Sequence, residues 1–245
     1  MKYAVSAKTR VQPSPGAMGT CQCCGNALIA KCGTQRVWHW AHKSKKHCDH
    51  WWENETQWHR NWKNRFPDDW QEVIHSGDNG EKHIADIKTP DGLVIEFQHS
   101  YISSEERLSR EKFYANMIWI VDGRRTKNDL KRITKLHEHS VTTPPWYYWR
   151  QGEVIKINDP DWYLPKAWLA SRFKVYFDFG YIERPGDDLD GRISPPWNSH
   201  LVCLNPVSPN ELNGYQRSLY VLNKTKFLRD LKFPHSETPF WNERT

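Results

Sequence analysis

A hairpin near the middle of the chain imposes the strongest constraint on its fold. The run HIADIKTPDGLVIEFQHS, residues 83–100, contains two β-like segments joined by a Pro-Asp-Gly sequence at 90–92. That sequence predicts a three-residue loop, a type I turn completed by a glycine in the left-handed conformation. In the resulting register, Asp86 lies directly across from Glu96.

Two carboxylates in that position repel each other, because cross-strand Cβ atoms are about 5 Å apart. The repulsion is relieved either by a raised pKa or by a cation such as Mg²⁺, which prefers carboxylate oxygens. Strand alternation places Gln98 on the same face as Glu96. The pattern alone is a weak signal, since exposed hairpins often carry acidic residues by chance.

The length of 245 residues allows one large domain or a core with appendages. No apolar run approaches the roughly 18 residues that span a membrane, and the first ten residues lack the apolar segment of a signal peptide. We therefore expect a cytoplasmic protein without a membrane partner. The sequence does not predict an oligomeric state.

Five of the six cysteines lie between Cys21 and Cys48, a clustering that favours metal binding over a disulfide framework. Cys21 and Cys24 form a CxxC pair, and His39 and His42 follow after two short β-like runs. This arrangement predicts a structural Zn²⁺ site of the ribbon or knuckle type. Cys48 and His47 remain alternatives for the fourth ligand, and a reduced cysteine cluster without metal is the other interpretation.

Positive charge is concentrated at the front of the chain. Residues 1–65 contain eleven Lys and Arg residues against three acidic residues, a balance of +8. Such a segment favours docking of a polyanion such as DNA, with Lys43 and Lys45 as candidate contacts, although a solvated basic surface explains the charge equally well.

Residues 51–66 have tryptophans at helical spacing and predict an amphipathic helix that Pro67 ends. Glu55, His59 and Lys63 recur every four residues along one side of that helix. Glu55 falls within the tryptophan stripe, where a carboxylate needs a partner. The alternative is an ordinary file of surface ion pairs.

Strand and helix patterns continue on both sides of the hairpin. Residues 70–76 predict a strand, the capping box SSEE opens a helix over 103–115, and MIWIVDG predicts a buried strand. Arg107 and Arg110 on that helix are candidate phosphate contacts, with salt bridges to neighbouring glutamates as the alternative. The order helix, strand, hairpin, helix, strand predicts an α/β core.

The back half predicts a helix over 126–138, four strands within EVIKI, KVYFDF, HLVCL and SLYVL, and a final helix in NKTKFLRDL. The acidic sequence DDLDG is interpreted as a turn rather than as a metal site. We divide the chain into a lead-in and zinc knuckle at 1–50, an α/β core at 51–138 and an accessory α+β region at 139–245.

The α/β core resembles the PD-(D/E)XK nuclease superfamily, and residues 19–125 resemble more closely the CoiA-like competence proteins. The resemblance is carried by the CxxC pair, HWAH, WWENETQWHRNWK, IADIKT, IEFQHS and the SRE-x-FY helix ahead of MIWIVDG. It implies a Mg²⁺-dependent deoxyribonuclease with Asp86 and Glu96 as metal ligands and Glu55 as a further acidic group. Two positions depart from the family pattern: Gln98 replaces the usual lysine, and CQCC replaces CPxC.

The expected function is hydrolysis of DNA by a water molecule that Mg²⁺ or Mn²⁺ activates, in DNA uptake, recombination, repair or defence. Gln98 is expected to position that water, and Lys63 or His59 to supply positive charge or a proton. The alternative is a noncatalytic nucleic-acid-binding protein with a decayed nuclease core and a zinc knuckle.

Overall fold

The protein has a mixed α/β fold in this computed structural model, which describes residues 1–44, 48–78, 80–126, 128–129, 131–132, 135, 152, 154–179, 200–206 and 216–232. The chain divides into two compact units. The first comprises Met1–Ile102 and Leu108–Ile118, and the second comprises Ser103–Arg107 and Trp119–Thr245. None of the helices in the described ranges is long and apolar enough to cross a membrane.

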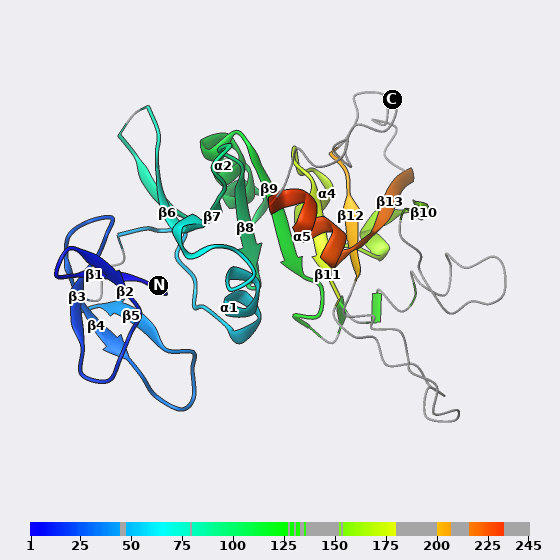
Figure 1. Cartoon of the computed structure of the whole chain (residues 1–245). Helices are drawn as coiled ribbons and strands as arrows, with labels where there is room; N and C mark the ends of the chain where they lie inside the picture. The colour runs from blue at the N-terminus through cyan, green and yellow to red at the C-terminus, as the bar shows by residue number, and fades with distance from the viewer. Residues whose placement is uncertain are drawn as a thin grey trace. The chain divides into compact units, whose positions relative to one another are not determined.

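The first unit begins with a five-stranded antiparallel sheet of order β2-β1-β3-β4-β5 (Figure 1). β4 matches the predicted run ALIAK, and β5 overlaps the end of the predicted run RVWHW. Residues 1–20, which we expected to form an extended lead-in whose end pairs with later strands, contribute three strands, of which β3 pairs with β4. Gly19 allows β3 to approach β1, because a Cβ atom there would lie 2.9 Å from that of Ala4. The strands are β1 (Ala4–Ser6), β2 (Thr9–Val11), β3 (Met18–Thr20), β4 (Ala27–Lys31) and β5 (His39–His42).

The predicted helix over 51–66 is shorter in the structure. α1 (Gln57–Lys63) begins after Thr56, whose extended backbone and side-chain oxygen cap the helix. Trp51 lies outside the helix and stacks on His83 of β7, with ring centroids 3.4 Å apart. Glu55 therefore precedes the helix instead of lying on its side.

The predicted hairpin is confirmed. β7 (Lys82–Lys88) pairs with β8 (Val94–Gln98) in the expected register, with Ile87 opposite Ile95. Gly92 has φ +87°, and its N–H donates to the carbonyl of Thr89 across the loop. Asp86 is thus placed across from Glu96.

β6 (Gln71–Ser76) pairs antiparallel with the other edge of β7. Gln71 lies opposite Ile87 and Val73 opposite Ala85, so the intervening Glu72 falls across from Asp86. Glu72 has φ +50°, a left-handed conformation that is rare for glutamate. The 3-10 helix η1 (Asp68–Trp70) leads into this strand.

α2 (Ser104–Tyr114) and β9 (Met117–Asp122) complete the predicted order of core elements. The hydroxyl of Ser103 accepts from the N–H of Glu106, as the capping-box sequence predicts. The order helix, strand, hairpin, helix, strand is therefore present as expected.

In the second unit, β10, β13, β12 and β11 form consecutive antiparallel pairs, and β11 runs parallel to β9. The four strands and the final helix match the predicted runs. The DDLDG sequence lies outside the described residues, as does most of the predicted helix over 126–138. The elements are β10 (Val154–Asn158), η2 (Pro160–Trp162), α4 (Lys166–Leu169), β11 (Val175–Asp178), β12 (His200–Leu204), β13 (Gln216–Asn223) and α5 (Lys224–Lys232).

Candidate functional site

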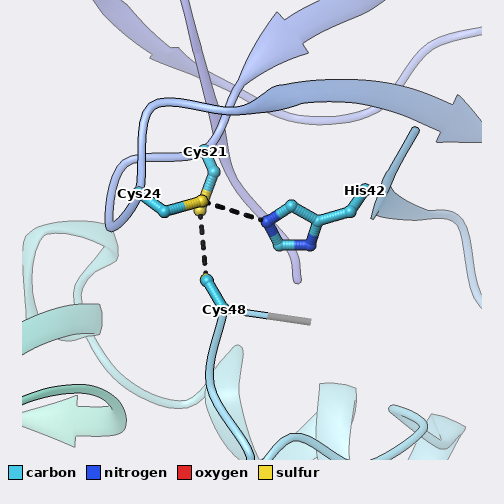
Figure 2. Close-up of side chains that lie close together, drawn as sticks. All are labelled: Cys21, Cys24, His42 and Cys48. Carbon is cyan, nitrogen blue, oxygen red and sulfur yellow. Dashed lines mark hydrogen bonds between the residues drawn. The ribbon is translucent and has the colours of Figure 1, made fainter. Parts of the chain in front are cut away.

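Four potential metal ligands converge beside the N-terminal sheet (Figure 2). Cys21 and Cys24 lie in the turn between β3 and β4, where the N–H of Gly25 donates to the carbonyl of Cys21. His42 ends β5, and Cys48 follows it in the chain. The ligand atoms of the two turn cysteines, His42 and Cys48 all lie within 4.8 Å of one another.

The spacing of these atoms fits a tetrahedral zinc site. Zn–S bonds of about 2.3 Å and Zn–N bonds of about 2.0 to 2.1 Å place two sulfurs about 3.8 Å apart, and a sulfur and a nitrogen about 3.6 Å apart. The Sγ atoms of Cys21 and Cys48 are separated by 3.7 Å, and Cys24 Sγ lies 3.4 Å from His42 Nε2. This cluster can therefore hold a zinc ion.

The structure replaces one predicted zinc ligand. His39 is not part of the cluster, and its Nδ1 instead lies 2.8 Å from the carbonyl of Val37. His39 and His42 are three positions apart on a β-strand, so their side chains point to opposite faces. Cys48, which the sequence left as an alternative, takes the fourth position.

Charge in the cluster also favours a cation. Burial, followed by the neighbouring Cys21 thiolate, raises the pKa of the Cys48 thiol above its usual range. Burial likewise raises the pKa of Cys21. Because several thiolates cannot coexist there without compensation, a divalent ion would stabilise the deprotonated ligand set.

The second candidate site is a row of three carboxylates on neighbouring strands, namely Glu72 of β6, Asp86 of β7 and Glu96 of β8. The backbone N–H of Asp86 donates to Oε1 of Glu96 over 3.1 Å. The N–H of Phe97 donates in return to Oδ2 of Asp86 over 3.0 Å. These two bonds hold the predicted carboxylate pair side by side.

Lys63 of α1 inserts its ammonium among the carboxylates. Its Nζ atom lies 2.9 Å from Asp86 Oδ1, 3.0 Å from Glu72 Oε1 and 3.8 Å from Glu55 Oε1. Burial opposes the charge, but the three carboxylates, Asp86 foremost, raise the pKa of Lys63 well above its ordinary value. The buried ammonium is therefore charged.

His59, one helical turn before Lys63, bonds the other oxygen of Asp86, with 2.8 Å between Nε2 and Oδ2. Burial tends to raise the pKa of Asp86, but His59 and then Lys63 hold it well below the usual range. The structure thus brings together His59 and Lys63, which the sequence places on one side of a helix, and Asp86 of the hairpin.

Glu55 reaches the same region from the segment before α1. Arg60 binds both of its oxygens, through Nε at 2.7 Å and Nη2 at 2.9 Å. Burial opposes the charge of Glu55, but Lys63 and Arg60 hold its pKa below the usual range. Its charge is therefore already matched by basic side chains.

Glu96 behaves differently from the other carboxylates. Burial and the adjacent Asp86 carboxylate raise its pKa to about 8, although Arg110 acts in the opposite direction. Arg110 Nη1 lies 3.3 Å from Glu96 Oε2, and its Nη2 donates to the carbonyl of Trp51. In the absence of a metal, Glu96 therefore holds its proton to a higher pH than an ordinary glutamate does.

A cavity of about 70 Å³ adjoins these groups. That space accommodates several water molecules, since one needs about 10 to 15 Å³ by this measure. The titratable side chains that line it are Asp49, Glu53, Glu55, His59, Lys63, Glu72, Asp86, Glu96, Arg110 and Tyr114.

Gln98 is buried on the face of Glu96, as predicted, but its amide turns to other partners. Its Nε2 lies 3.1 Å from Ser100 Oγ and 3.4 Å from Glu53 Oε2. Glu53 lines the cavity, whereas Gln98 is not among the described residues that line it. Gln98 therefore contacts Glu53, whose Oε2 also accepts from the N–H and the hydroxyl of Ser100.

The four predicted phosphate contacts have different environments. Arg107 is buried, and Arg110 is buried against Glu96, so neither presents an open guanidinium surface. Arg110 contacts the strand carboxylate Glu96 through Nη1. Lys43 is exposed after β5, and Lys45 lies outside the described residues.

Two carboxylates that we did not single out attach the N-terminal sheet to the carboxylate site. Glu72 accepts the backbone N–H groups of Lys2 and Tyr3, at 2.7 and 3.0 Å. Asp49, directly after the candidate zinc ligand Cys48, accepts the N–H of Ile84 on β7 at 3.0 Å. The β6–β7 register would have revealed Glu72, whereas no local pattern marks Asp49.

Comparison with known proteins gives a family match for the segment that carries the metal-ligand cluster. No curated protein and no solved structure matches the chain. Residues 19–50, which contain all four clustered zinc-type ligands, match the family model of the N-terminal domain of competence protein CoiA. This match supports membership of the chain in the CoiA-like competence protein family.

Proposed function

We propose that the carboxylate site is the active site of a Mg²⁺- or Mn²⁺-dependent deoxyribonuclease with a PD-(D/E)XK-like core. The observation that carries the proposal is the close pairing of Asp86 with Glu96, whose pKa is raised by burial and by the adjacent Asp86 carboxylate. A divalent cation would replace the proton on Glu96.

The donor set fits such an ion. A carboxylate offers roughly four acceptor sites. Asp86 uses three of them on His59, Lys63 and the Phe97 N–H, and Glu96 uses two on the Asp86 N–H and Arg110. Oxygen lone pairs therefore remain on both side chains, beside a cavity with room for water.

The metal, when bound by Asp86 and Glu96, would lower the pKa of a coordinated water and offset negative charge that develops on the phosphate. Lys63 already places a buried positive charge 2.9 Å from Asp86. Lys63 therefore supplies from α1 the positive charge that the superfamily's usual lysine would supply from β8, where this chain has Gln98. Electrostatic stabilisation by a buried, preorganised cation is stronger than in water.

His59 is the group best placed to move a proton. Its Nε2 is fixed on Asp86, which orients the imidazole. The Asp86 carboxylate thus links the proposed metal to a proton-transfer group and to a fixed cation. This combination suits hydrolysis of a phosphodiester better than binding alone.

The proposal is tested by incubating zinc-loaded protein with linear, circular and single-stranded DNA in the presence of Mg²⁺, Mn²⁺ or neither. We expect metal-dependent cleavage that Asp86→Asn and Glu96→Ala each reduce by at least about a hundredfold, the scale of one lost electrostatic group. Asp91→Asn is the matched control, because Asp91 lies in the same hairpin but does not line the cavity.

Equal rates for wild type and Asp86→Asn on every substrate would refute the catalytic proposal. Retained DNA affinity without cleavage by wild type would instead support the noncatalytic binding protein. Zinc content and urea unfolding of each variant show whether a lost rate reflects a lost fold.

A further inference from the structure

A second hollow lies between residues 33–38 and residues 54–57. It is an open groove with a volume of about 890 Å³, far larger than the carboxylate cavity. Glu55 lines both. The groove therefore borders the proposed active site through a shared side chain.

One wall of the groove carries an exposed and anchored indole. Trp38 is 45% exposed, and its Nε1 donates to the carbonyl of Gly33 over 3.1 Å. Its own carbonyl accepts from Nη2 of Arg60, the residue that also binds Glu55. These bonds fix the tryptophan relative to Glu55 before any ligand arrives.

The other groove side chains have the chemistry of a nucleotide site. Arg36 is an exposed cation, and Gln35 and Asn54 are exposed amides that can both donate and accept hydrogen bonds. The amide nitrogen of Gln57 is bonded to Asn61, so its oxygen is the group offered to a ligand. Amides of this kind pair with base edges, and guanidinium groups bind phosphate.

The net charge of the N-terminal segment favours an anionic ligand. Residues 1–48 contain eight Lys and Arg residues and no Asp or Glu. Glu55, the acidic residue of the groove, is held by Arg60. A nucleic-acid strand approaching this segment therefore meets a net positive potential.

We propose that this groove binds a stretch of single-stranded DNA, with a base stacked on Trp38 and a phosphate on Arg36. The groove presents one guanidinium beside an indole and three amides, a set that reads unpaired bases rather than a duplex backbone. Binding of the strand does not depend on the proposed nuclease function. Only its biological role does, which is to lead the DNA past Glu55 to the carboxylate cavity.

The test is binding of a fluorescently labelled single-stranded oligonucleotide to the zinc-loaded full chain, measured by anisotropy without Mg²⁺ or Mn²⁺. Loss of one stacking contact weakens binding by about tenfold or more, so Trp38→Ala should show that loss and Trp38→Phe should retain most of the affinity. Trp162→Ala is the matched control, since Trp162 is an exposed indole of the second unit.

Arg36→Ala should also lower the salt dependence of binding by about 0.7 in the slope of log K against log salt, as expected for one lost phosphate contact on a single strand. Equal affinities for Trp38→Ala and Trp162→Ala, or equally strong competition by a duplex of the same sequence, would overturn the inference. Because no cleavage is measured, loss of this site and failure of the nuclease proposal give separate results.

Discussion

The ammonium of Lys63 lies 2.9 Å from Asp86 Oδ1, so a helix and a hairpin that are separate in sequence meet in one buried ion pair. Removing one partner of such a pair leaves the other charge uncompensated. We expect Lys63→Met to destabilise the protein by about 3 to 5 kcal/mol in urea unfolding. Lys82→Met, at an exposed position of β7, should change stability by less than about 0.5 kcal/mol. Similar urea midpoints for the two variants would show that the Lys63–Asp86 pair contributes little to the free energy of unfolding.

Glu96 predicts a pH dependence of stability. Its pKa is about 8 in the folded state against 4.5 for an ordinary glutamate, so between these pH values the folded state binds one more proton than the unfolded state. Stability should therefore fall as pH rises through that window, by up to about 1.4 kcal/mol per pH unit, and level off above it. Glu96→Gln removes this contribution.

The measurement is the difference in unfolding free energy between wild type and Glu96→Gln from pH 6 to pH 9 without Mg²⁺. Taking the difference cancels titrations shared by both proteins, including that of His83, whose pKa is raised chiefly through Asp49 against the effect of burial. A difference that stays constant with pH would contradict the protonated Glu96.

The candidate zinc cluster includes His42 but not His39, although both lie on β5. His42→Ala and Cys48→Ser should each lower bound zinc well below one ion per chain, because they remove a tetrahedral ligand. His39→Ala should keep the ion, since its side chain points to the other face of β5. Metal content by atomic emission checks this, and loss of zinc in His39→Ala with retention in Cys48→Ser would reverse the assignment.

Glu72 predicts a local effect on the N-terminal strand. Glu72→Ala removes the acceptor of the Lys2 and Tyr3 N–H groups, so these two amides should exchange with solvent at least about tenfold faster. The N–H of Ile84, which Asp49 holds, provides an internal control. Unchanged exchange at Lys2 and Tyr3, or equal acceleration at all three amides, would argue against a specific anchor.

Sequence patterns predicted the parts of this fold that local chemistry determines. The Pro-Asp-Gly loop fixed the register of β7 and β8, and with it the pairing of Asp86 and Glu96. The spacing of His59 and Lys63 on one helix likewise brought both to Asp86.

Parts that depend on distant segments were not predictable in the same way. Strand alternation points His39 and His42 to opposite faces of β5, so only His42 joins the cluster. Cys48, which lies beyond β5, provides the remaining ligand. Trp51 stacks on His83 outside the helix, and α1 begins only after Thr56, so Glu55 lies in the preceding segment. Glu72 required the pairing of β6 with β7, which no short motif encodes.

The central claim is that Asp86 and Glu96 hold a divalent cation, and Mn²⁺ binding by electron paramagnetic resonance tests it most directly. Zinc-loaded wild-type protein should remove about one equivalent of Mn²⁺ from the free-ion signal. Its affinity for Mn²⁺ should be higher at pH 8 than at pH 6, because the ion competes with the proton on Glu96. Asp86→Asn should bind at least about tenfold more weakly, the scale of losing one charged ligand, while Asp91→Asn binds as wild type does. Equal binding by wild type and Asp86→Asn, or no binding by wild type at millimolar Mn²⁺, would contradict the account.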